Sequence, residues 1–228
     1  NKLSSDGTTS VAALSFSHSG SLAAYQISEG GADWRSVAVM DAKTLQVIDR
    51  IDDVKFSGLS WLGDEGFYYS RYDQPKGNEL TAKTDQHKLY FHKVGEEQEA
   101  DALIFGGDPN NKFRYVSGQV TEDQQYLIIS GANSTSGNRL YIQKLEDKST
   151  AIRPVVEDES SDIYVLTSVE DTLYAYTNRD ADNGRIVSFS YAASDPSSWV
   201  EVIEETEHVL TASTVGGFLF AEYMIDAI

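Results

Sequence analysis

Apolar and polar residues alternate along most of the chain, in short runs separated by Gly, Asp, Asn and Ser. A period of two residues is typical of strands with one buried face. The runs are rich in Tyr, Phe, Val, Thr and Ile, which suit a pleated and half-buried surface. We find no long capped segment with the 3.6-residue period of an amphipathic helix. The pattern therefore predicts an all-β protein.

One unit recurs, formed by an apolar strand, a polar turn and a more strongly apolar strand. The five copies lie at residues 11–27, 58–71, 117–130, 164–177 and 210–223. Their turns are marked by Gly20, Glu65, Asp123, Asp171 and Gly216, which are 45, 58, 48 and 45 residues apart. Blades of β-propellers repeat about every 40–50 residues. The spacing therefore favours a propeller over two stacked β-sandwiches, an alternative that requires no such period.

Each of the first four hairpins is followed by two further strand-like segments. The third strands are expected at 34–40, 87–93, 139–143 and 185–190, and the fourth at 46–51, 102–105, 151–156 and 200–203. Four antiparallel strands in each unit predict propeller blades. We expect one partial, unclosed propeller domain over 1–228, with blades at about 8–56, 57–110, 111–160 and 161–206 and an incomplete fifth at 207–228. Open sheet edges at both ends would favour self-association.

The formal net charge is −18 and the chain has no cysteine. Such a surface repels nucleic acid and anionic membranes, so we expect neither as a partner. The absence of cysteine excludes disulfides and a cysteine nucleophile. No apolar run is long enough to span a bilayer, and the chain opens without Met. We expect a cytoplasmic protein, with the periplasm as the alternative.

Known catalytic and metal-binding patterns are not met. The chain has no G-x-S-x-G nucleophile motif, and the Ser-rich run 131–137 reads as a surface loop. The histidines His18, His87, His92 and His208 read as surface or pocket-lining residues. His87 and His92 would point to opposite faces of one strand, so they cannot share a metal. The calcium-like run 180–184 has no Glu at loop position 12. We therefore expect no cofactor, no metal and no catalytic residue.

Several segments carry a resemblance to a known family. The chain opens with Asn-Lys-Leu-Ser-Ser-Asp-Gly-Thr at 1–8 and has Val-Lys-Phe-Ser at 54–57, followed by Trp61 and by Gly-Phe-Tyr-Tyr-Ser-Arg-Tyr at 66–72. Gln-His-Lys-Leu-Tyr-Phe-His-Lys-Val-Gly follows at 86–95 and Asn-Arg-Leu-Tyr at 138–141. These segments resemble the propeller domain of prolyl oligopeptidases (prolyl endopeptidases). The likeness covers essentially the whole chain and is looser after about residue 140.

The resemblance implies a role beside an α/β-hydrolase domain that carries the Ser-Asp-His triad. We expect a gating and substrate-selecting portion of a serine endopeptidase that cleaves short peptides after proline. The chain itself would be non-catalytic, and its partners would be the hydrolase domain of the same polypeptide and short proline-containing peptides. A stand-alone propeller used as an interaction scaffold is the alternative.

Two positions are candidates for contact with substrate. The family's Val-Lys-Phe-Ser phenylalanine contacts substrate and matches Phe56, although an aromatic residue here could equally pack between blades. Tyr115, at the start of the third blade, is the weaker candidate, because its residue type differs from that of animal members. Animal members also have an arginine and a cysteine near the substrate, and neither occurs in 131–137.

Overall fold

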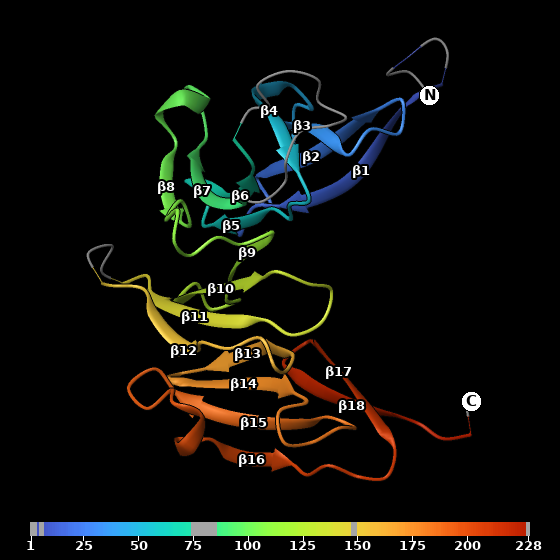
Figure 1. Ribbon diagram of the computed structural model, residues 1–228. Helices are drawn as coiled ribbons and strands as arrows, with labels where there is room; N and C mark the ends of the chain where they lie inside the picture. Colours follow the sequence, from blue (N-terminus) through green and yellow to red (C-terminus); the bar gives the residue numbers. More distant parts are fainter. Residues whose placement is uncertain (1–3, 5–6, 74–85, 147–149, 227–228) are drawn as a thin grey trace. The chain divides into compact units, whose positions relative to one another are not determined.

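The computed structural model describes residues 4, 7–73, 86–146 and 150–226, and its regular structure is almost entirely β (Figure 1). The described strands are β1 (Thr9–Phe16), β2 (Leu22–Glu29), β3 (Trp34–Asp41), β4 (Val47–Lys55), β5 (Ser60–Leu62), β6 (Gly66–Arg71), β7 (Lys88–Lys93), β8 (Ala102–Phe105), β9 (Tyr115–Val120), β10 (Tyr126–Ala132), β11 (Arg139–Lys144), β12 (Arg153–Val156), β13 (Ile163–Val169), β14 (Thr172–Thr177), β15 (Arg185–Ser190), β16 (Val200–Ile203), β17 (Val209–Val215) and β18 (Phe218–Met224). Two short 3-10 turns, η2 (Gln98–Ala100) and η3 (Pro196–Ser198), interrupt them.

The described strands form five antiparallel sheets, four with four strands and one with two. This confirms the expectation of an all-β protein with four complete four-stranded sheets and half of a fifth. The chain divides into two compact units, residues 1–120 and 121–228. The expected blade boundaries remain a prediction.

The first unit contains two complete sheets, β1-β2-β3-β4 (sheet 1) and β5-β6-β7-β8 (sheet 2). Its core lies where they pack together, with Val37, Val39 and Ile51 from sheet 1 against Phe67 and Tyr69 from sheet 2. Alternate residues of each strand enter this core, as the period-two pattern requires. The last strand of the unit, β9, lies against β5, β6 and β7.

A polar turn ties the hairpins of sheets 1 and 2 together. Asp64, in the β5–β6 turn, accepts hydrogen bonds from the hydroxyls of Ser19 and Ser21 at 2.6 and 3.3 Å. Hydrogen bonds from serine side chains, of which Ser19 contributes most and Ser17 next, lower the pKa of the Asp64 carboxyl to about 2. The Trp61 indole also donates to the Ser15 carbonyl at 3.3 Å. Polar residues in the turns of the repeated hairpins thus join neighbouring sheets.

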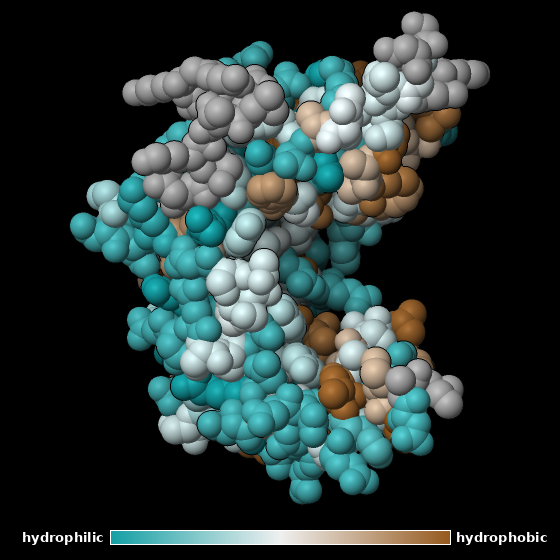
Figure 2. Space-filling view, turned by 45° about the vertical axis from the view of Figure 1, so that its right-hand side comes forward, coloured by the Kyte–Doolittle hydropathy of each residue, from teal (hydrophilic) through white to brown (hydrophobic). Residues whose placement is uncertain are grey.

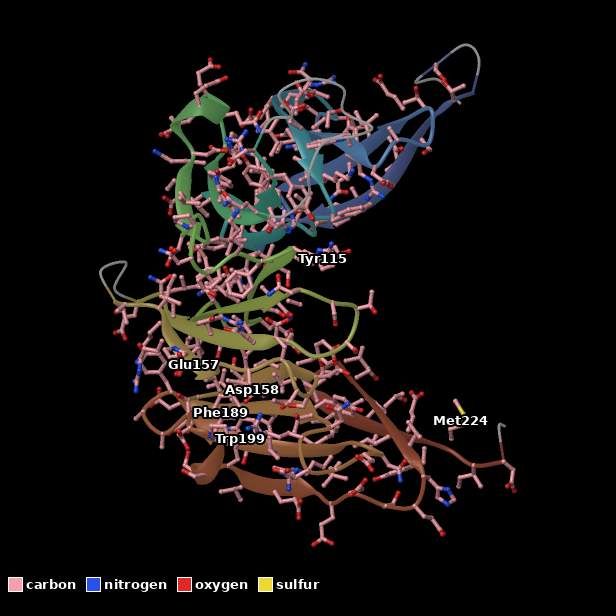
Figure 3. The ribbon with its side chains drawn as sticks, in the orientation of Figure 1. Tyr115, Glu157, Asp158, Phe189, Trp199 and Met224 are labelled. Carbon is pink, nitrogen blue, oxygen red and sulfur yellow. The ribbon has the colours of Figure 1, made fainter. Side chains whose placement is uncertain are left out.

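The second unit repeats this arrangement with β10-β11-β12, sheet β13-β14-β15-β16 and the hairpin β17-β18. Its core holds Tyr126, Ile142, Ile163, Leu173 and Phe189. Phe189 stacks on Trp199 with ring centroids 5.8 Å apart. Both residues are labelled in Figure 3.

The acidic turns recur here as well. Asp171 accepts from the Tyr126 hydroxyl at 3.0 Å, and Asp123 accepts from the Ser168 hydroxyl at 2.8 Å. No helix in the described part of the chain is long and apolar enough to cross a membrane.

Candidate functional site

Phe56 lies in the connection from β4 to β5, where the chain passes from sheet 1 to sheet 2. Its φ of 52° is in the left-handed region, which a bulky side chain rarely adopts. The register of β3 against β4 shifts just before it, and Asp53 in that irregularity also has a positive φ of 56°. A bulge changes where the following side chains point. The Phe56 side chain ends 49% exposed rather than packed in the core.

The backbone on both sides of Phe56 is held by buried polar side chains. His87 Nε2 lies 3.0 Å from the Lys55 carbonyl oxygen. The Gln26 amide donates to the Ser57 carbonyl at 2.7 Å. The Ser57 hydroxyl in turn accepts from the Ser70 N–H at 2.7 Å. A strained conformation persists only where the surroundings determine it fully, and these bonds supply that determination.

Tyr115, the first residue of β9, lies beside Phe56. The two ring centroids are 6.1 Å apart with an interplanar angle of 59°. The Tyr115 side chain is 39% exposed, and Figure 3 shows where it leaves β9. The structure therefore brings together both residues named from the sequence, although one lies in the β4–β5 connection and the other begins β9.

Tyr72 is a buried residue that contacts Phe56, and we call Phe56, Tyr115 and Tyr72 the aromatic cluster. Its ring meets Phe56 edge-on at 6.4 Å and stacks on His87 at 4.3 Å. Its hydroxyl donates to the Arg114 carbonyl at 2.5 Å. Burial raises the pKa of the Tyr72 hydroxyl to about 12, so it stays a neutral donor. Tyr72 thus joins Phe56 to the residue that precedes Tyr115.

The ammonium of Lys55 adjoins the aromatic rings. The Lys55 ammonium lies 5.1 Å from both the Trp34 and the Phe56 ring centroids and 3.9 Å from an Asp33 carboxylate oxygen. A positive charge over an aromatic face is attracted by the ring quadrupole, which helps to orient the Phe56 ring. The exposed faces of Phe56 and Tyr115 can pack against apolar or ring-shaped groups of a ligand.

The sequence predicts histidines at the surface or lining a pocket, and for His87 and His92 the structure rules out the surface. His87 and His92 are 1% and 0% exposed rather than on the surface. His92 lies between the carboxylates of Asp49 and Asp101, at 2.9 and 2.8 Å. Among the described residues no group of three or more His, Cys, Asp or Glu is arranged to hold a metal ion.

The sequence did not identify His87, Gln26 or Tyr72 as parts of the site. His87 and Tyr72 fall inside the family-like segments, but residue type alone does not show which backbone groups a side chain reaches. The run 131–137 is bonded more firmly than a free surface loop. The Asn133 side chain donates to Glu159 at 3.0 Å, and the Gly137 N–H donates to Asp162 at 2.7 Å.

Comparison with known proteins shows which family the chain resembles. Residues 1–228 match the family model described as the prolyl oligopeptidase N-terminal β-propeller domain. The prolyl endopeptidase of Elizabethkingia meningoseptica is 49% identical over 230 residues, covering 100% of this chain and 32% of that protein. The prolyl oligopeptidase ophP of Omphalotus olearius is 29% identical and covers 88% of the chain. The chain thus spans about a third of the length of its curated relatives.

Solved structures agree. One structure from a study of two prolyl endopeptidases has a TM-score of 0.87 at 26% identity and covers 97% of this chain and 32% of its own. Prolyl oligopeptidase B of Galerina marginata, bound to a 35mer substrate, has a TM-score of 0.88 at 24% identity over 98% of this chain and 34% of its own. At that identity it shows the fold alone.

The repeated four-stranded antiparallel sheets, together with the likeness to solved propeller domains, place the chain in the β-propeller class. This confirms the expected fold. It belongs to the family of prolyl oligopeptidase N-terminal β-propeller domains.

Proposed function

We propose that the chain is the substrate-selecting propeller portion of a prolyl endopeptidase, and that Phe56 and Tyr115 contact the peptide. The enzyme would cleave short peptides after proline, with the reaction carried out by an α/β-hydrolase domain of the same polypeptide. Family membership and the 49% identity to a named prolyl endopeptidase support this role. For one of the solved prolyl endopeptidases, inter-domain dynamics has a described role in catalysis and specificity.

The left-handed, half-exposed Phe56 carries the proposal. A bulky residue in this conformation costs about 1–2 kcal/mol, and burial of the ring does not repay it, because half of the side chain faces solvent. Strain of this kind is concentrated at ligand-binding sites. Phe56 also lies beside a second exposed aromatic ring, and aromatic residues are enriched where ligands bind.

The test is Phe56→Ala in the full-length protein that contains this chain. A contact kept from bound substrate through the transition state contributes uniform binding. We therefore expect KM for a proline-containing peptide to rise about fivefold, with kcat little changed, which corresponds to about 1 kcal/mol for one aromatic contact. Steady-state kinetics and thermal unfolding should be measured on the same preparation.

Leu45→Ala is the matched control. Leu45 is also apolar, exposed and left-handed, with φ 59°, but it lies in the turn between β3 and β4 at the other end of sheet 1. This control should leave KM unchanged. A large fall in Tm for Phe56→Ala with normal kinetics would show that Phe56 only packs. Unchanged KM for both Phe56→Ala and Tyr115→Ala would instead favour the scaffold alternative.

A further inference from the structure

His87 is a buried imidazole whose hydrogen bonds go to the two segments that carry the exposed aromatic pair. Its Nδ1 accepts from the Val116 N–H at 2.9 Å. Its Nε2 lies 3.0 Å from the Lys55 carbonyl oxygen, which can only accept. Its own backbone N–H donates to the Phe113 carbonyl at 2.9 Å. One residue therefore contacts the backbone next to Phe56 and on both sides of Tyr115.

This bonding fixes the protonation state of the ring. Because Nδ1 accepts from an N–H and Nε2 faces a carbonyl, His87 is neutral with its proton on Nε2. Burial lowers the pKa of His87 to about 4, in agreement with a neutral ring near neutral pH. The face of the ring stacks on Tyr72, which itself touches Phe56. The imidazole thus has few degrees of freedom left.

Among the described residues, Lys55 and Arg114 meet His87 and its partner Tyr72 through backbone carbonyls. Lys55 presents its carbonyl to His87 and turns its ammonium toward Trp34 and Phe56. On the β9 side, Arg114 presents its carbonyl to the Tyr72 hydroxyl.

We propose that His87 is a positioning residue that sets the spacing and orientation of Phe56 and Tyr115, and thereby the selection of peptides at this pair. The inference rests on the proposed function for its kinetic consequence. Its structural part, a bridge between the β4–β5 connection and the start of β9, does not. Gln26, 1% exposed, assists by holding the Ser57 side of Phe56 while its own oxygen accepts from Arg35 at 2.8 Å.

Two substitutions separate the chemistry of His87 from its volume. His87→Gln retains a donor and an acceptor in one planar group, whereas His87→Leu retains bulk but neither bond. In the full-length protein we expect His87→Leu to raise KM about fivefold, as far as Phe56→Ala does, and His87→Gln to restore most of the loss. Phe67→Leu, a core change in sheet 2 away from the pair, should lower Tm without raising KM.

A combined substitution gives the decisive result. If His87 acts through the aromatic pair, then adding His87→Leu to a protein that already carries Phe56→Ala and Tyr115→Ala should leave its KM unchanged. Multiplied effects on KM would show that His87 acts elsewhere and would overturn the proposal.

A spectroscopic measurement covers the case in which His87→Leu does not fold. In the wild-type protein, NMR of the imidazole should show a proton on Nε2 and none on Nδ1, together with ring contacts between Phe56 and Tyr115. The opposite tautomer, or a charged ring at pH 7, would refute the bridge even if Phe56→Ala raises KM. Conversely, unchanged KM in Phe56→Ala with the expected spectrum would refute the proposed function and its kinetic consequence while the bridge stands.

Discussion

At the candidate site, buried polar side chains hold the backbone of the exposed residue Phe56. Phe56 keeps an unfavourable backbone conformation because His87 and Gln26 occupy the carbonyls on either side of it. Each of those buried side chains would be costly without its partners. The cost of the strain and the cost of losing the bonds therefore oppose each other, and the second prevails in the folded protein.

The neutral His87 makes the first unit sensitive to acid. Its pKa is about 4 in the folded chain and about 6.5 when exposed. Between these values the unfolded state binds the proton and the native state does not, so stability falls as pH falls from about 6.5 to 4. The full effect is about 3 kcal/mol. Urea unfolding at pH 7 and 4.5 should show this loss, and His87→Gln should remove most of it.

The measurement can be confined to the first unit. Trp34 and Trp61 lie in it, and Trp199 lies in the second unit. In a Trp199→Phe background, tryptophan fluorescence therefore reports the first unit alone. Asp64 and Asp158, with pKa values of about 2, titrate below this range. An identical pH dependence in wild type and His87→Gln would contradict the assignment.

At the scale of elements, alternation in the sequence located the strands well. The predicted bounds of β8, β15 and β16 agree with the structure, because turns with Gly, Asp or Pro close to their ends interrupt the pattern. The fourth strand of sheet 1 is expected to end at residue 51, whereas β4 runs to Lys55. Asp52 and Asp53, just beyond the expected end, form the irregularity that continues β4 toward Phe56.

The candidate site was predicted only as two residue names. Phe56 and Tyr115 came from family resemblance, and their contact joins segments about sixty residues apart, which alternation cannot pair. The expected strand at residue 58 begins only at Ser60, because Ser57 bonds to Gln26 and Ser70 instead of entering a ladder. Such bonds depend on tertiary structure, so the left-handed conformation of Phe56 could not be foreseen.

Sheets 1 and 2 are also joined by a charged seam. His92, from β7, lies between Asp49 of β4 and Asp101 after η2, and Asp101 also accepts from the Tyr69 hydroxyl at 2.7 Å. Burial disfavours the imidazolium, but the hydrogen bonds to the two carboxylates outweigh it and raise the pKa of His92. Two carboxylate partners require a donor at both ring nitrogens, so His92 is charged.

This seam should weaken in alkali. A raised pKa means that the stabilisation is complete below the unfolded value of 6.5 and is lost as pH rises through the folded value. In the Trp199→Phe background, the first unit should therefore become less stable above neutral pH. Asp49→Asn removes one carboxylate and should move this loss to lower pH. Stability that is constant from pH 6 to 9 in both proteins would show that His92 is neutral.

At the scale of the whole molecule, apolar side chains remain exposed on sheet edges in each unit. In the first unit they lie on β1, an edge strand of sheet 1, and include Val11, Leu14 and Phe16. In the second they lie on β17 and β18 and include Phe218 and Phe220. Figure 2 shows hydrophobic surface over both regions, and Met224, labelled in Figure 3, extends from the end of β18. Exposed apolar edge strands favour association with another chain.

The 228-residue polypeptide, produced by itself, is therefore expected to self-associate through these faces. Light scattering from low to high micromolar concentration should show a mass that rises with concentration. Leu14→Lys combined with Phe16→Lys places two like charges on β1 and should lower the mass, because burying an unpaired charge opposes association. Tyr164→Glu, an exposed aromatic change on β13, is the matched control and should have little effect. A strictly monomeric wild-type polypeptide at every concentration would contradict the prediction, as would a mass unchanged by charges on β1.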